Sequence, residues 1–320
     1  MPSLSRKVEE QIPCTLRLDR YVSEIMRLLS RSQIKARGLK AKINGKDVKI
    51  SRLVKQGDIL ELCWDDAPVE HITPQDIPLD IVYEDERCVV INKAQGMVVH
   101  PGAGNRQGTL ANALYFRKLQ SEKLPNQNGG NLSVSLRPGI VHRLDKETSG
   151  IIIAAYNDEA HAFLSQQFKE RKVKKNYVAV VNGVPKDKEG RIETCIARDP
   201  KDRKRFTVSS QGKAALTFYK VLKSWDNYSL VLLRPRTGRT HQLRVHMRHI
   251  GHPILADTVY GYNDKHFFNA HFPDMGLMLH SKSLTITLPG ETEERTFSSP
   301  MPERFLAVIE KLDRDTFNGK

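Results

Sequence analysis

Hydrophobic residues along the chain follow two different periods. Residues 151–155 are apolar at every position, which predicts a strand buried on both faces. Apolar residues at helical spacing predict amphipathic helices around residues 160–168 and 304–312. Further predicted elements are strands within residues 81–92, 177–183, 216–222, 228–233 and 284–288, and a helix at residues 109–118. The pattern therefore predicts a globular domain that mixes strands with helices.

The first part of the chain has a pattern of its own. Within residues 15–63, two short helical segments precede a hairpin around Asn44-Gly45 and one more strand. Residues 64–78 are rich in proline and acidic residues and show no period, so we expect a linker there. A second domain is then expected at residues 79–315, with a surface loop or an insertion at residues 121–136.

The charge balance favours a polyanionic partner. The 320 residues include 51 lysines and arginines against 37 aspartates and glutamates, so the net charge is +14. This balance suits nucleic acid, although a protein can also be merely basic. The four cysteines form no Cys-x-x-Cys pair, which argues against a zinc ribbon or a disulfide framework. The charged start and the lack of a long apolar run argue against a signal peptide and a membrane span, so we expect a cytoplasmic protein.

The strongest candidate for chemistry is Asp145. It lies in the polar loop Val141-His142-Arg143-Leu144-Asp145-Lys146, which leads into the buried strand. Arg143 and Lys146 flank the carboxylate and would keep it ionised, so that it can serve as a nucleophile or a base. From this stretch alone, an ordinary aspartate that caps a turn remains an alternative.

Other kinds of site fit the sequence less well. His246 and His249 have the spacing of metal ligands on a helix, but their neighbours are cations, which repel metal ions, so we predict no metal site. Asp145 and Glu147 are a conceivable glycosidase pair, yet nothing else supports a carbohydrate substrate. The sequence contains no Walker loop and no Gly-x-Gly-x-x-Gly, so no nucleotide cofactor is predicted.

Three segments together resemble a known enzyme family. Their order and spacing are similar to those of the signature segments of the RluA-type pseudouridine synthases, and the likeness covers about residues 80–290. The segments are Val141-His142-Arg143-Leu144-Asp145 with Thr148-Ser149-Gly150, Lys175-Asn176-Tyr177, and Thr237-Gly238-Arg239-Thr240-His241-Gln242-Leu243-Arg244-Val245-His246. Asn92-Lys93, Gly96 and Val99-His100-Pro101 add to the likeness.

The resemblance implies both a fold and a reaction. The fold is an α+β catalytic domain built on a mixed, largely antiparallel sheet, preceded by a small α/β RNA-binding module. In the reaction, uracil is cut from the ribose of a uridine in RNA, turned, and rejoined through a carbon atom. This isomerisation needs a nucleophile and a pocket that keeps the free base captive, and it needs no metal, ATP or redox cofactor.

The same resemblance implies a role for individual residues. Asp145 corresponds to the nucleophile, and Arg244 to the arginine that pairs with it. Tyr177 corresponds to the tyrosine that stacks on the base and is a candidate for removing its proton. Arg143 corresponds to the arginine that fills the space left when the uridine is flipped out of its stack. Pocket-wall and substrate-binding positions are Leu279, His142, Arg239, Thr240 and His241.

Residues 15–63 resemble the small RNA-binding module named after ribosomal protein S four. The likeness rests on Arg17-Leu18-Asp19-Arg20, Ser30-Arg31-Ser32, Ile43-Asn44-Gly45-Lys46 and Val54-Lys55-Gln56-Gly57-Asp58, and it implies a grip on structured RNA. Cations available for phosphates are Arg17, Arg20, Arg31, Lys35, Arg37, Lys40 and Lys42 here, and Lys172, Lys174, Lys175, Arg203, Lys204 and Arg205 in the second domain. A solvated charged surface is the alternative.

The expected substrate is large-subunit ribosomal RNA or its precursor particle, bound by a monomer. Residues 98–105 most resemble the RluD-like members of the family, which act on that RNA. A synthase for transfer RNA or for other ribosomal sites is one alternative, and a non-catalytic ribosome-assembly factor is another. The intact Asp145, Tyr177 and Arg244 argue against a pure binding protein. One departure is Ala94, where family members usually carry a proline, a change that removes a rigid turn residue but no reactive group.

Overall fold

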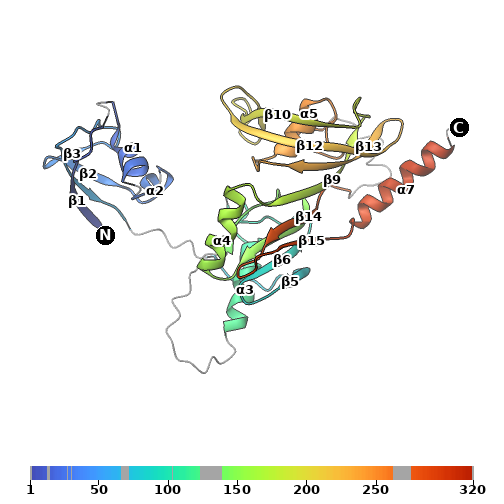
Figure 1. Ribbon diagram of the computed structural model, residues 1–320, viewed down its shortest axis with the longest axis horizontal. Helices are drawn as coiled ribbons and strands as arrows, with labels where there is room; N and C mark the ends of the chain where they lie inside the picture. The colour runs from blue at the N-terminus through green and yellow to red at the C-terminus, as the bar shows by residue number, and fades with distance from the viewer. Residues whose placement is uncertain are drawn as a thin grey trace. The chain divides into compact units, whose positions relative to one another are not determined.

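A computed structural model describes residues 2–12, 15–26, 28–29, 31–65, 72–102, 104–122, 139–261 and 275–318. The chain divides into two compact units, Met1–His71 and Ile72–Lys320. Figure 1 shows the elements of each unit along the chain. Of the loop expected at residues 121–136, the last fourteen residues lie outside the described ranges, and the first two belong to the end of a helix.

The first unit is a four-stranded antiparallel sheet with short helices. The strand order is β1-β4-β2-β3. The hairpin between β2 and β3 turns at Asn44 and Gly45, which both have positive φ, as the Asn-Gly pair predicts for this tight turn. The elements are β1 (Ser3–Lys7), α1 (Leu18–Arg20), the π-helical turn η1 (Tyr21–Ile25), α2 (Arg31–Ala36), β2 (Lys40–Ile43), β3 (Lys46–Val48) and β4 (Ile59–Cys63).

Both ends of the first unit differ from the expected range of 15–63. Strand β1 pairs with β4 along its whole length, so the sheet includes residues well before position 15. Trp64 is buried in the core of the first unit. Within the expected linker 64–78, residues from 72 onward belong to the second unit, where the Asn112 side chain donates to the Thr73 carbonyl at 2.7 Å. The described residues of the expected linker, 64–65 and 72–78, therefore belong to the two units.

The second unit is organised around one eleven-stranded sheet. Its order is β11-β10-β12-β13-β9-β14-β8-β6-β5, while β15 pairs with β14 and β7 with β8. β14 and β8 are parallel, and the other pairs described are antiparallel. The α+β class with a mixed, largely antiparallel sheet is therefore confirmed. The strands are β5 (Ile81–Glu84), β6 (Cys88–Lys93), β7 (Gly139–Ile140), β8 (Ser149–Ala155), β9 (Lys174–Asn182), β10 (Glu189–Arg198), β11 (Phe206–Val208), β12 (Lys213–Ser224), β13 (Tyr228–Pro235), β14 (Leu279–Thr287) and β15 (Glu294–Ser298).

Strand β8 is the buried strand that the apolar run predicts. All seven of its residues are buried, with Ile152 and Ala154 in the main core and Ile151 and Ile153 in a second cluster on the other face. Gly150 has φ +109° and lies against β14, where a Cβ would stand 2.2 Å from the Ser281 carbonyl oxygen. Only glycine fits there, because both the backbone conformation and the space exclude a side chain. Gly150 thereby permits the parallel contact between β8 and β14.

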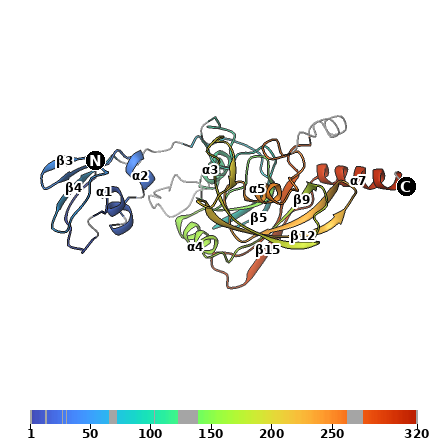
Figure 2. The same cartoon turned by 90° about the horizontal axis from the view of Figure 1, so that it is seen from above.

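Four helices are described in the second unit: α3 (Leu110–Glu122), α4 (Asp158–Lys169), α5 (Gln242–His249) and α7 (Glu303–Asn318). α4 begins where the Asn157 side chain accepts the Ala160 N–H at 2.8 Å, a standard N-cap. Both views show α7 as a long helix that leaves the sheet at one end (Figures 1 and 2), and its buried side chains lie in the main core. None of the helices in the described ranges has the length and the apolar character needed to cross a bilayer.

Candidate active site

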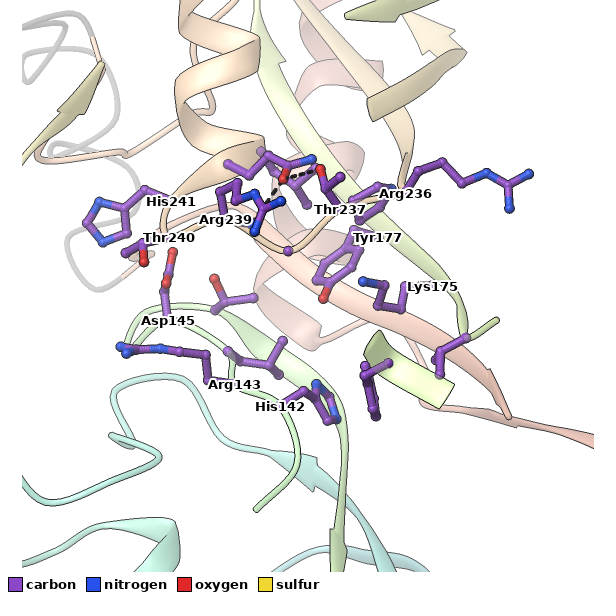
Figure 3. A pocket seen from close by; sticks show the side chains of 18 of the residues that line it. His142, Arg143, Asp145, Lys175, Tyr177, Arg236, Thr237, Arg239, Thr240 and His241 are labelled. Carbon is purple, nitrogen blue, oxygen red and sulfur yellow. Dashed lines mark hydrogen bonds between the residues drawn. The ribbon is translucent and has the colours of Figure 1, made fainter. Parts of the chain in front are cut away.

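A cavity of about 500 Å³ lies where four distant segments of the second unit meet. Its lining comes from the loop before β8, the segment from the end of α4 into β9, the segment from the end of β13 into α5, and the first residue of β14. Figure 3 shows Asp145 and Arg143 on one side of this cavity and Tyr177 with Thr240 and His241 on the other. The cavity therefore exists only when the fold brings these distant segments together.

A buried lysine holds the loop that carries Asp145. Lys93 is 1% exposed, and its ammonium donates to the carbonyls of Ala94, Met97 and Lys146 at 2.7, 2.9 and 3.2 Å. Burial lowers the pKa of Lys93 to about 8, although nearby carboxylates act in the opposite direction. The lysine thus ties the backbone next to Asp145 to the end of β6 and the turn after it.

Arg244 stands between two carboxylates. Its Nε and Nη2 donate to the two oxygens of Asp257, both at 2.7 Å, and its Nη1 lies 3.7 Å from Oδ2 of Asp145. The Asp257 side chain is fully buried, whereas that of Asp145 is 17% exposed toward the cavity. Burial alone would lower the pKa of Arg244, but the bonds and charge of Asp257 raise it overall. The arginine is therefore oriented by Asp257 and presents its remaining edge to Asp145.

Tyr177 places an aromatic ring in the cavity. It lies on β9, is 8% exposed, and belongs to the main core as well as to the cavity wall. Burial raises the pKa of Tyr177 to about 12; contact with Ser281 opposes this shift, and the charge of Asp145 adds to it. The side chain is thus a neutral phenol at physiological pH that forms part of the cavity wall. Leu279 on β14 also lines the cavity.

The segment between β13 and α5 is shaped by a buried glutamine. Oε1 of Gln242 accepts from the Thr237 hydroxyl at 2.7 Å and from the Arg239 N–H at 3.0 Å. His241 has φ +55° and shares a hydrogen bond of 2.8 Å between its Nδ1 and the Tyr260 hydroxyl. The Arg239 side chain donates through Nε to the Ala214 carbonyl at 3.0 Å. This segment is therefore fixed at several points, with Thr240 directed toward the cavity (Figure 3).

Burial disfavours the charged forms of His142 and Lys175. Burial lowers the pKa of His142 to about 3, and its Nε2 accepts the Ile153 N–H at 3.0 Å. The His142 ring stacks on Phe168 with 4.5 Å between centroids. Burial also lowers the pKa of Lys175 to about 8. His142 is thus a neutral wall of the cavity rather than a cation.

The cations expected to meet RNA phosphates divide into two sets. Several already form ion pairs: Arg17 and Arg31 with Asp19, Arg20 with Glu24, Lys172 with Glu170, and Lys174 with Glu294. Arg37 donates to the Asp65 carbonyl. The exposed cations with no ion pair described are Lys35, Lys40, Lys42, Arg203 and Lys204, while Arg205 is half-buried. Lys175 differs from the rest because it lines the cavity.

Two residues of the cavity region were not predicted from the sequence. Asp257 holds Arg244, and Tyr260 bonds to His241 and lies under Arg244, with its ring centroid 5.0 Å from the guanidinium carbon. Neither lies in a periodic segment or in the family motifs. The available signal was Arg244 itself, because an arginine on the apolar side of a helix needs a carboxylate partner when it is buried.

His246, one of the two histidines considered as metal ligands, has other partners. His246 is fully buried, and its ring nitrogens bond to the hydroxyls of Thr194 and Thr217 at 3.0 and 2.9 Å. Across the described ranges, no three side chains of His, Cys, Asp or Glu are grouped so that they would hold a metal ion. His246 therefore serves as a hydrogen-bonding group inside the protein.

Comparison with known proteins decides the family. The pattern of the RNA pseudouridylate synthase family matches residues 87–249, half of the chain. A protein from Borreliella burgdorferi named ribosomal large subunit pseudouridine synthase D is 42% identical over 92% of this chain and 89% of its own length. The chain belongs to the RNA pseudouridylate synthase family. This confirms the family predicted from the three motifs.

Other relatives of this RNA pseudouridine synthase support the same conclusion. A protein from Aquifex aeolicus described as an uncharacterized RNA pseudouridine synthase is 41% identical over 93% of this chain and 94% of its own length. Human RNA pseudouridylate synthase domain containing 4 superposes with a TM-score of 0.57 and 27% identity, covering 73% of this chain and 93% of that one. The chain is thus an enzyme that isomerises uridine to pseudouridine in RNA.

Proposed function

We propose that this pseudouridine synthase modifies large-subunit ribosomal RNA and that Asp145 is its nucleophile. Support for the substrate comes from the Borreliella burgdorferi relative, which is named for that RNA and aligns over nearly all of both chains. The net charge of +14 suits a large RNA. Support for the nucleophile comes from the position of Asp145, whose carboxylate faces the cavity 3.7 Å from Arg244. This arrangement of Asp145 and Arg244 is the observation that carries the proposal.

Arg244 keeps Asp145 oriented while uridine is cut from its sugar. The arginine is fixed by two bonds to Asp257, so it does not need to move when the charge on Asp145 changes during bond formation. A fixed cation in a partly dry cavity favours the anionic carboxylate and supplies an electrostatic partner at little cost in reorganisation. Asp145 then attacks the nucleoside, and the bond between the ribose and the base nitrogen breaks. The base turns and a ring carbon bonds to the ribose in place of the nitrogen. Asp145 is released as the free carboxylate, and the proton lost from that carbon passes to solvent while the nitrogen takes one up.

Tyr177 holds the uracil by stacking. Its raised pKa keeps the phenol neutral, which favours a stacking surface and a hydroxyl donor over a base in the free enzyme. Arg143 points away from the cavity centre in Figure 3. In this proposal it occupies the stack that the flipped uridine leaves. Leu279 and the neutral His142 form walls, and the segment with Arg239, Thr240 and His241 closes the opposite side.

The first unit and the exposed cations of the second unit bind the rest of the RNA in this proposal. Lys35, Lys40 and Lys42 are exposed on the first unit, and Arg203 and Lys204 on the second. A cytoplasmic enzyme acting on ribosomal RNA or its precursor particle fits this set of features.

Pseudouridine mapping tests the proposal. Cells lacking the protein are complemented with the wild type or with Asp145→Asn, and ribosomal and transfer RNA are mapped. We expect specific large-subunit uridines to lose modification and only the wild type to restore it. With purified protein and transcribed RNA, Asp145→Asn should lower kcat by at least about 10⁴-fold while RNA binding stays near wild type. Loss of sites confined to transfer RNA, or full rescue by Asp145→Asn, would overturn the proposal.

A further inference from the structure

A second hollow lies beside the active-site cavity, on the open face of the sheet. It has a volume of about 900 Å³ and spans strands β10, β12, β13, β9 and β14. We call it the sheet groove. Val173, Lys175, Pro235 and Arg236 line both hollows, so the two hollows adjoin along a shared rim. In Figure 3, Arg236 extends away from Asp145, toward the side on which the groove begins.

The floor of the sheet groove is an aromatic ring among cations. Phe218 on β12 is 37% exposed, although a phenylalanine in the middle of a sheet is ordinarily covered. It lies directly opposite Arg191 on one neighbouring strand and Arg234 on the other. The guanidinium carbon of Arg236 stands 6.0 Å from the centre of its ring. An open ring flanked by arginines is the arrangement used for stacking bases of single-stranded nucleic acid.

The charges of the sheet groove suit a phosphate backbone. Its lining contains six cations and one carboxylate, Glu189; the cations are Lys174, Lys175, Arg191, Lys220, Arg234 and Arg236. Lys174 pairs with Glu294 and Arg191 lies 3.3 Å from Glu193, but the one side-chain bond described for Arg234 goes to the neutral Asn176. Arg234 therefore has donors left for a phosphate. A phosphate at the shared rim would also offset the charge of the half-buried Lys175.

We propose that the sheet groove holds unpaired nucleotides of the RNA strand that adjoin the target uridine, with one base stacked on Phe218 and phosphates on Arg234 and Arg236. The inference rests on the proposed function, because a strand must leave the active-site cavity once its uridine is flipped into it. Continuity at the shared rim gives that strand a direct path onto the groove. The bases there are unpaired, since the faces of a paired base are covered by its neighbours in the helix.

Binding measurements on the full chain test the sheet groove. The probes are a fluorescein-labelled single-stranded oligouridine of about 12 nucleotides and an RNA duplex of the same length. We expect Phe218→Ala to weaken binding of the single strand by about 5-fold or more. Phe218→Tyr should bind like the wild type, because it keeps the ring. Leu222→Ala is the matched control, since Leu222 is an exposed apolar residue of the same strand outside the groove.

The phosphate contact of Arg234 is tested through the salt dependence of RNA binding. Arg234→Gln should reduce the slope of log Kd against log salt by about 0.7, the effect of one phosphate contact on a single strand. Arg314→Gln, on the exposed side of α7, removes a cation elsewhere in the same unit and should leave the slope unchanged. Arg234 is exposed, so its substitution should leave the fold intact. The salt-dependence experiment therefore remains informative even if Phe218→Ala impairs folding.

Two results would overturn the proposal that the sheet groove binds unpaired nucleotides. The first is a Phe218→Ala protein that binds the single strand as tightly as Leu222→Ala. The second is an equal loss on the duplex, since a paired helix offers no free base to the ring. Failure of the proposed function gives a different pattern. In that case ribosomal RNA is not modified, while the oligouridine still depends on Phe218, because binding needs no turnover.

Discussion

At the scale of single residues, Arg244 is the side chain on which the site depends most. It makes two short bonds to the fully buried Asp257 and leaves its third nitrogen toward Asp145. Asp257 thus fixes the orientation of Arg244, and Arg244 in turn faces the carboxylate of Asp145. This division means that the two carboxylates have different roles, although both lie beside the same guanidinium.

Asp257→Asn should destabilise the fold as well as abolish activity. The substitution leaves Arg244 buried without its charged partner, and removing one member of a buried ion pair costs about 3–5 kcal/mol. Asp145→Asn is the matched control, because Arg244 keeps Asp257 in that variant; its free energy of unfolding should stay within about 1 kcal/mol of wild type. Urea denaturation of both variants measures the difference. Equal destabilisation by the two substitutions would contradict this assignment.

Sequence reasoning located one side of the site better than the other. Asp145, Tyr177 and Arg244 were singled out by their motifs, and Leu279 as a pocket-wall position that the family resemblance implies. The structure brings all four to one cavity. The motifs sufficed because they end next to strands and a helix whose apolar patterns fix their direction. Asp257 was missed because it lies in a short irregular segment, and which carboxylate approaches a buried arginine depends on tertiary packing.

At the scale of elements, the strands that are buried on one or both faces were predictable and the solvated ones were not. β8 and β13 show continuous apolar runs, and the prediction of each is confirmed. β10 was not predicted, since its sequence is mostly polar and only Ile192 and Ile196 are buried apolar residues. β1 is exposed at all five positions and gave no signal either. Strands of this kind are specified by the neighbours with which they pair.

The buried face of helix α7 should contribute far more to the stability of the fold than its exposed face. Phe305 is fully buried in the main core, whereas its neighbour Leu306 is 53% exposed. Phe305→Ala should therefore lower the free energy of unfolding by about 3–5 kcal/mol. Leu306→Ala should change it by less than about 0.5 kcal/mol. Thermal or urea unfolding of the two proteins gives the comparison, and similar losses would show that α7 packs differently from the structure described here.

At the scale of the whole molecule, the chain consists of two compact units, and the active-site cavity lies in the second. All residues of the active-site cavity belong to Ile72–Lys320, and the first unit has a sheet and an apolar core of its own. The two parts were separable in the sequence because a proline-rich segment lies between them. The limits of the first unit were set too narrowly, because β1 joins its sheet from outside the predicted range.

Removal of residues 1–71 should weaken RNA binding and leave catalysis in part. The truncated protein loses the exposed lysines of the first unit, so the slope of log Kd against log salt should decrease. The rate with saturating RNA should fall less than the affinity, since the cavity is intact. Binding and single-turnover assays on transcribed RNA test this. Complete loss of activity in a truncated protein that still folds would contradict it.

Two buried histidines should make the protein sensitive to mild acid. His246 and His280 are fully buried, and burial lowers the pKa of each to about 4. Between pH 6.5 and about 4 the unfolded chain binds protons that the folded chain does not, so the free energy of unfolding decreases as the pH falls. The slope is up to about 1.4 kcal/mol per pH unit for each histidine.

Urea denaturation between pH 7.5 and 5 measures that slope. His280→Gln provides the control, because it removes one titrating group whatever it does to the stability at neutral pH. The variant should show a shallower dependence on pH than the wild type. Identical slopes in the two proteins would assign the acid sensitivity to other groups.

The place of β14 in the sheet has a consequence for how the enzyme folds during its synthesis. This strand follows all the other described strands of the sheet except β15 along the chain, yet it lies in the interior of the sheet, between β9 and β8. A nascent chain that ends before residue 279 cannot join the two halves of the sheet, and long-range pairing of this kind is slow. Asp145 and Arg244 are therefore brought together stably only after β14 has left the ribosome. Translation products that end before β14 should be inactive.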